Sequence, residues 1–246
     1  MDANRRFANG FQLRGVYTWS KSLDDGTALN SSVGANAPGF VMFPGNPKLD
    51  WGPSTADARH IAVVNSSYEL PFGSGKKFLA NQHGLSQKLI SGWTLSGVET
   101  IQSGLPFTPQ LGFNPTNNGY SRNPIRPSWN PAFSGPVVLG GPNQYFNINA
   151  FILPPTGTYG NVGRDVLYGP GLATTDLSLA KNTSISEKLR LQFRAEFFNI
   201  FNRANFGSPN AVVFASASAT PSPTAGVITS TSTTSRQIQF GLKLLW

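Results

Sequence analysis

Few residues in this chain are of the types that carry out catalysis. Its 246 residues include two histidines, His60 and His83, and neither has a metal-binding residue three or four positions further on. Asp57 lies close to His60 in sequence, but residues three apart on a strand point to opposite faces and cannot act as an acid–base pair. Cysteine is absent, which excludes zinc fingers, iron–sulfur clusters and disulfide scaffolds. The sequence therefore predicts no enzyme activity, no metal centre and no cofactor.

Two other groups of residues have both a chemical and a structural interpretation. Asp24 and Asp25 precede Gly26 and could bind calcium, but an acidic pair before glycine is more typical of a turn. Several aromatic residues in the predicted loops could contact a ligand or could pack the longest loop against itself. They are Tyr120, Trp129, Tyr145, Phe146, Phe151 and Tyr159.

Composition and charge narrow the fold class. Only 12% of the residues are charged, and the net charge of +8 comes from scattered lysines and arginines rather than from clusters. Nucleic-acid-binding proteins usually gather their positive charge into patches, so we expect no nucleic-acid partner. No stretch approaches 18 consecutive apolar residues, which excludes a transmembrane helix. An all-β chain with long polar loops remains.

Six segments alternate apolar and polar residues at the period of two that strands require. They cover residues 7–22, 59–72, 92–104, 174–183, 187–201 and 236–246. A short helix is expected near residues 85–90. The connections are alternately long and short, and three of them exceed 30 residues, which is rare in compact soluble domains. Outer-membrane barrels have this asymmetry, with long extracellular loops and short periplasmic turns.

The alternation also assigns the two faces of such a barrel. Lipid-facing positions are predicted at Leu189, Leu191, Phe193, Phe197, Ile238, Phe240 and Leu242. Lumen-facing positions are predicted at Arg190, Gln192, Arg194 and Glu196. A soluble extracellular β-sandwich would show the same alternation and remains an alternative.

The last strand has the form of an assembly signal. Gln239, Gly241, Leu244 and the terminal Trp246 resemble the β-signal by which the barrel-assembly machinery recognises a C-terminal strand. Trp246 and Trp93 are expected at the periplasmic boundary, where an amphipathic ring is stabilised by one wet side and one apolar side.

Several motifs resemble the barrels of TonB-dependent receptors, in particular the large Oar-like receptors of acidobacteria. The motifs are Tyr68–Gly73, Gly92–Gly97 with Gln102–Pro109, Gly160–Arg164 with Gly169–Gly171, Asp176–Leu179 and Phe193–Asn202. The resemblance extends from about Phe11 to Trp246 and is weakest in the loops. It implies an antiparallel barrel of about 22 strands around an N-terminal plug, which receives energy through a TonB-contacting segment.

The resemblance sets the expected domain organisation and location. Residues 1–246 are expected to be the C-terminal, partial barrel domain, without the plug, in the bacterial outer membrane. The signal peptide would be missing because the natural N-terminus is missing. Six strands are fewer than the eight of the smallest single-chain barrels, so the first predicted strand would have an unpaired edge.

The expected function is that of a fragment of an outer-membrane receptor that takes up an unidentified substrate with TonB-coupled energy. The fragment would not transport by itself. A structural or adhesive outer-membrane barrel without energised transport is the alternative, beside the soluble sandwich. The expected partners are outer-membrane lipid, the assembly machinery at the C-terminal strand, and the TonB system through the missing plug alone.

Overall fold

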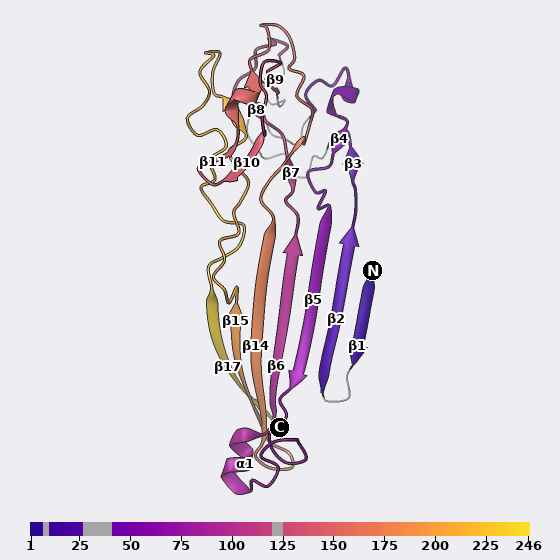
Figure 1. The fold of residues 1–246 in the computed structure, drawn as a ribbon, viewed down its shortest axis with the longest axis vertical. Helices are drawn as coiled ribbons and strands as arrows, with labels where there is room; N and C mark the ends of the chain where they lie inside the picture. Colours follow the sequence, from indigo (N-terminus) through magenta and orange to yellow (C-terminus); the bar gives the residue numbers. More distant parts are fainter. Residues whose placement is uncertain (7–9, 27–40, 120–124) are drawn as a thin grey trace.

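A single large sheet organises the computed structural model, which describes residues 1–6, 10–26, 41–119 and 125–246. Its seven strands are antiparallel and lie in the order β1-β2-β5-β6-β14-β15-β17 (Figure 1). Their bounds are Asp2–Arg6 (β1), Phe11–Trp19 (β2), His60–Glu69 (β5), Trp93–Gln102 (β6), Leu172–Ser184 (β14), Arg190–Phe198 (β15) and Gln237–Leu245 (β17). The all-β, antiparallel class expected from the alternation is therefore what the chain adopts.

The sheet contains one strand more than the six predicted. β1 pairs with β2 from Asp2↔Val16 to Arg6↔Gln12, so β2 is not an edge of the sheet. The sequence of β1, DANRR, has no apolar alternation, and the prediction of strands by alternation therefore missed it. A polar edge strand of this kind is common, because charged side chains discourage pairing with other chains.

The two edge strands of the sheet are β1 and β17. Seven alternating strands place β1 and β17 in the same direction, and both arrows point downward in Figure 1. All nine residues of β17 are exposed. Within the described residues no strand pairs with the outer side of either edge, so the sheet is not a closed barrel.

The long connections gather at one end of the sheet into a cap, defined here as residues 41–58, 103–119, 125–171 and 199–235 (Figure 1). The short strand β3 (Leu23–Asp24) precedes the cap in sequence and pairs with its strand β4. The elements of the cap are η1 (Pro47–Asp50), β4 (Gly52–Pro53), β7 (Pro106–Phe107), β8 (Gln110–Leu111), β9 (Ser128–Trp129), β10 (Val138–Gly141), β11 (Gln144–Phe146), η2 (Ile148–Ala150), β12 (Phe151–Ile152), β13 (Leu167–Tyr168) and β16 (Val212–Phe214). They enclose a hydrophobic core of Met42, Leu111, Ile125, Phe146, Ala150, Phe151, Val162, Leu167, Val213, Phe214 and Ala225. The cap is thus a packed unit built from segments far apart in sequence.

The opposite end of the sheet has shorter connections. The turn between β14 and β15 spans five residues, and the longer connection between β5 and β6 contains α1 (Gly84–Ile90). The C-terminus lies near α1 in Figure 1. Among the described residues, no helix has the length and apolar character needed to cross a membrane.

Candidate functional site

The register of the strands separates the sheet into an apolar and a polar face. Directly paired residues share a face in an antiparallel sheet. Phe193 pairs with Leu242 and Phe197 with Ile238. Leu191 and Phe240 follow by alternation, and the Phe193 and Phe240 rings stack with centroids 6.3 Å apart. Six of the seven predicted lipid-facing residues thus lie together on the apolar face.

Leu189, the seventh, is not in a strand. β15 begins at Arg190, and the Leu189 carbonyl accepts hydrogen bonds from the Ile185 and Ser186 N–H groups at 2.8 and 3.1 Å. Leu189 therefore closes the turn between β14 and β15, because these bonds take its backbone out of the ladder. It continues the alternation in sequence without belonging to the strand.

The four predicted lumen-facing residues lie together on the polar face, where Gln192 and Glu196 form hydrogen bonds across strands. The Gln192 amide donates to Asn182 on β14 at 3.0 Å. The Gln239 amide on β17 donates to the Glu196 carboxylate. The same carboxylate lies 3.6 Å from the Arg194 guanidinium on its own strand. These contacts tie β14, β15 and β17 together on a hydrophilic surface.

Three charged residues of the described strands lie on the apolar face, and none was singled out from the sequence. One of them, Arg5, lies on the edge strand β1 and pairs with Leu13 of β2. Counting by twos from Trp93 places Glu99 on this face, where it pairs with Thr175 and accepts a hydrogen bond from the Thr175 hydroxyl. Lys181 pairs with Trp93, and its Nζ lies 4.9 Å from the Trp93 ring centroid and donates to the Ser91 carbonyl at 2.6 Å. Glu99 and Lys181 therefore each have a polar partner.

A buried ion pair holds the cap together. The Arg126 guanidinium donates to the Asp50 carboxylate at 2.6 Å, and both side chains are almost fully buried. Arg126 also donates to the Leu49 carbonyl at 2.7 Å, and Asp50 accepts from the Met42 N–H at 2.8 Å. The pair joins segments 76 residues apart in the sequence. Each charge is compensated by more than one hydrogen bond, as buried charges require.

A second buried arginine, Arg164, extends this network. It donates to the Asp50 carbonyl at 2.7 Å and to the backbone and carboxylate of Asp24. The carboxylate of the neighbouring Asp165 lies 3.4 Å from the Arg164 guanidinium. It also accepts a hydrogen bond from the Thr108 hydroxyl at 2.8 Å. Asp24, considered above for a turn or calcium, lies in β3 and forms an ion pair with Arg164.

Asp165 is an acid in this network whose pKa is raised above its ordinary value. Burial raises its pKa from 3.8 to about 6, and the negative charge of Asp24 adds to this rise. The hydrogen bond from Thr108 and the positive charges of Arg164 and Arg126 act in the opposite direction and lower the pKa. Asp57 contrasts with it: burial acts to raise its pKa, but the Ser22 N–H and Arg59 outweigh burial and lower it. Among the described carboxyls of the cap, Asp165 thus has its pKa raised to about 6.

We expect the Asp165→Asn variant to remove a pH dependence from the stability of the cap. Because the folded pKa of Asp165 lies above its ordinary value, the wild-type cap should lose stability as the pH rises from about 3.8 to about 6, and then level off. Asparagine keeps an oxygen for Thr108 and does not ionise. Denaturant unfolding of both proteins across this range measures the difference, and identical profiles would contradict the prediction.

The aromatic residues of the predicted loops mostly pack against one another. Phe146 and Phe151 are buried and meet edge-to-face with centroids 5.8 Å apart. Trp129 stacks on Phe151 at 5.1 Å. Tyr145 is also buried, whereas Tyr120 lies outside the described residues. Packing, the structural interpretation of these residues, accounts for the described contacts.

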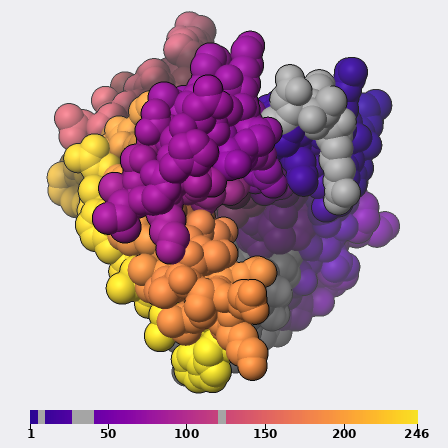
Figure 2. Space-filling view, turned by 90° about the horizontal axis from the view of Figure 1, so that it is seen from below, coloured from indigo at the N-terminus to yellow at the C-terminus, as the bar shows by residue number. Residues whose placement is uncertain are grey.

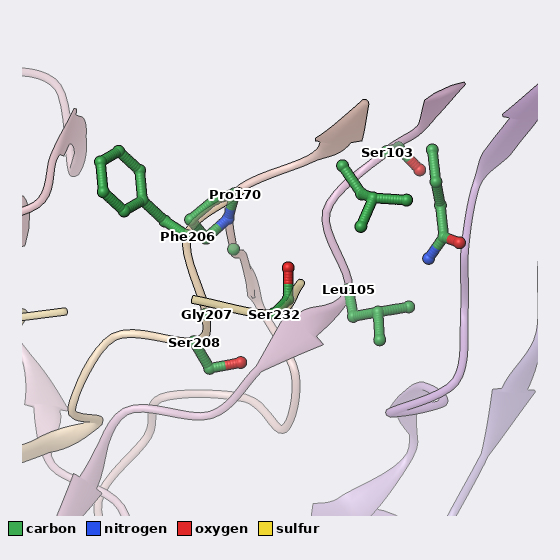
Figure 3. Close-up of a pocket in the computed structure, with 10 residues that line it drawn as sticks. Ser103, Leu105, Pro170, Phe206, Gly207, Ser208 and Ser232 are labelled. Carbon is green, nitrogen blue, oxygen red and sulfur yellow. The ribbon is translucent and has the colours of Figure 1, made fainter. Parts of the chain in front are cut away.

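A small cavity lies where the sheet meets the cap. Its volume is about 130 Å³, and Figure 3 shows Ser103, Leu105, Pro170, Phe206, Gly207, Ser208 and Ser232 around it. The lining is completed by Gly169 and by Gln102 and Leu172, which pair at the end of β6 and the start of β14. The lining has hydroxyl and amide groups and no charged side chain, so the cavity suits water or a small neutral polar group.

The histidines and Asp57 do not form a catalytic arrangement. His60 Nδ1 lies 2.8 Å from the Tyr17 hydroxyl, and the two rings stack. Asp57 is bound by the Ser22 N–H and by Arg59. His83 precedes α1 and is exposed. His60 and Asp57 therefore have different hydrogen-bond partners.

The described geometry, a two-faced antiparallel sheet with long connections packed at one end, agrees with a comparison against known families. A family model described as an outer membrane beta barrel domain matches residues 1–239. The chain belongs to this family. No curated protein and no solved structure matches it. Membership implies an outer-membrane location for this β-barrel domain.

The C-terminal strand of this barrel domain carries the predicted assembly signal on an exposed edge. Leu244 pairs with Leu191, Gln239 pairs with Glu196, and Trp246 is 93% exposed. A Cβ added at Gly241 would meet no atom within 4 Å, so the folded sheet does not require glycine there. The role of these residues in assembly stays a prediction.

The two tryptophans predicted at one boundary lie at the same end of the barrel domain. Trp93 begins β6, and its indole N–H donates to the Leu89 carbonyl of α1 at 2.9 Å. Trp246 follows β17, whose end lies near α1 in Figure 1. Both residues are therefore at the end with the shorter connections, opposite the cap.

Proposed function

We propose that this chain forms part of the barrel of an outer-membrane receptor that takes up a substrate with energy delivered through TonB. The observation that carries the proposal is the open, odd-numbered sheet of the described residues, with its three longest connections at one end. Its apolar face would meet lipid and its polar face an aqueous lumen, as in membrane barrels.

The direction of the edge strands favours a large barrel completed by further strands. β1 and β17 run in the same direction, so pairing them with each other would be parallel. Antiparallel closure therefore needs an odd number of additional strands. A total of about 22, as in the receptors that the sequence resembles, leaves an odd remainder. Two copies of this sheet with their caps at the same end would close only through two parallel seams.

The cap and the polar face fit a receptor. The cap is rigidified by its own core and by buried ion pairs, so it can hold loops in place over the end of the lumen. Arg190, Gln192, Arg194 and Glu196 make the adjoining face hydrophilic, as a wet or plugged lumen requires.

The proposal is tested in the source bacterium. Deleting the coding sequence for β14 to β17 should reduce growth on some limiting nutrient, and deleting TonB should reproduce that defect, with no further loss in the double mutant. A defect in adhesion or envelope integrity that is independent of TonB would contradict the proposal and support a structural or adhesive barrel.

A further inference from the structure

The connection between β5 and β6, residues 70–92, exposes a surface that is both apolar and basic. Leu85 and Leu89, one turn apart on α1, are 80% and 69% exposed. Phe78 and Leu79 are about half exposed as well. The segment contains three lysines and no acidic residue. Grouped apolar exposure of this kind marks an interaction surface.

An apolar hollow lies beneath this segment. Its volume is about 350 Å³, and its lining consists of Leu70, Phe72, Leu79, Ile90, Trp93 and Leu179. Trp93 and Leu179 lie on the apolar face of the sheet, two residues apart in register. The hollow is therefore continuous with the apolar face, and α1 forms one of its walls through Ile90.

Two lysines at this end of the sheet have their ammonium groups close to aromatic rings. Lys77 Nζ lies 5.4 Å from the Phe78 ring centroid, and Lys181 Nζ lies 4.9 Å from that of Trp93. Lys88 is exposed on α1 between Leu85 and Leu89. Lysines placed this way bury their stems on apolar surface and present their charge at a boundary with water. Figure 2 views this end, with the purple segment protruding beside the orange turn after β14.

We propose that this segment binds an anionic phospholipid, with an acyl chain in the hollow and the phosphate among Lys77 and Lys88. Continuity with the apolar face supplies the path for the acyl chain, and the basic, acid-free segment supplies the charge complementarity. The inference rests on the proposed contact of the apolar face with lipid and is independent of transport.

Because the chain has no cysteine, a single introduced cysteine can report on lipid contact. The test uses the full chain in phosphatidylcholine vesicles with or without phosphatidylglycerol, with a fluorophore at Leu85→Cys and nitroxide-labelled lipid as quencher. Phe240→Cys serves as the reference on the apolar face, and Ser218→Cys, exposed in the cap, as the reference in water. We expect quenching at positions 85 and 240, stronger at 85 with phosphatidylglycerol, and none at 218.

The charge contribution is tested by adding Lys77→Gln and Lys88→Gln to the Leu85→Cys protein. The preference for phosphatidylglycerol should then fall toward equal quenching in both vesicles. Lys188→Gln, an exposed lysine in the neighbouring turn, is the matched control and should leave the preference unchanged. An unchanged preference in the double variant, or the same loss in the control, would overturn the assignment of these lysines.

The other outcomes separate this inference from the proposal beneath it. Quenching at 240 without quenching at 85 overturns the phospholipid site and leaves the lipid-facing assignment intact. Absence of quenching at both positions overturns the lipid-facing assignment and this inference with it. Shielding of position 85 that depends on protein concentration rather than on lipid would show that a second copy of the chain covers the segment instead.

Discussion

Replacing Arg126 with methionine is expected to lower the free energy of unfolding of the cap by about 3–5 kcal/mol. The change leaves Asp50 buried with a charge and without the guanidinium 2.6 Å away. Methionine keeps much of the apolar stem, so the loss reflects the uncompensated carboxylate more than a cavity. The Leu49 carbonyl also loses its donor.

Hydrogen exchange of the cap amides measures this effect, with the Met42 N–H as a direct reporter because it donates to Asp50. Adding Asp50→Asn should restore part of the stability, because the buried charge is then gone. Arg14→Met is the matched control: its ion pair with Asp2 has the same chemistry but is exposed, and its loss should leave stability unchanged. Equal effects at Arg126 and Arg14 would contradict the prediction.

Replacing Gly104 with alanine is expected to destabilise the junction of sheet and cap by about 1–3 kcal/mol or more. A Cβ at this position would lie 1.7 Å from the Gly169 carbonyl oxygen, so the two backbone segments must separate. Neighbouring Leu105 and Gly169 are joined by a backbone hydrogen bond of 2.9 Å, which that movement would strain.

Faster exchange of the Gly169 N–H and a lower denaturation midpoint are the expected readouts for Gly104→Ala. Gly15→Ala is the matched control, because a Cβ on β2 at that position meets nothing within 4 Å. Alanine is also the better residue in a strand, so this control should be neutral or slightly stabilising. A neutral Gly104→Ala variant would show that the close approach is not required.

The strands could be predicted from the sequence because alternation is a local property. Leu191, Phe193 and Phe197 are two or four residues apart, so the pleat alone puts them on one face. β1 was not predicted, because its sequence DANRR has no alternation of apolar and polar residues. It is a strand because its backbone pairs with β2. Glu99 and Lys181 could have been placed on the apolar face by counting, but their partners Thr175 and Trp93 lie on other strands.

The sequence by itself determined an antiparallel all-β chain with two chemically distinct faces, because a period of two commits every second side chain to one side. The tertiary structure alone decided how the long connections fold. Arg126 meets Asp50 across 76 residues and Arg164 meets Asp24 across 140. No local pattern encodes such pairs, because the loops become neighbours only after the strands bring their ends together.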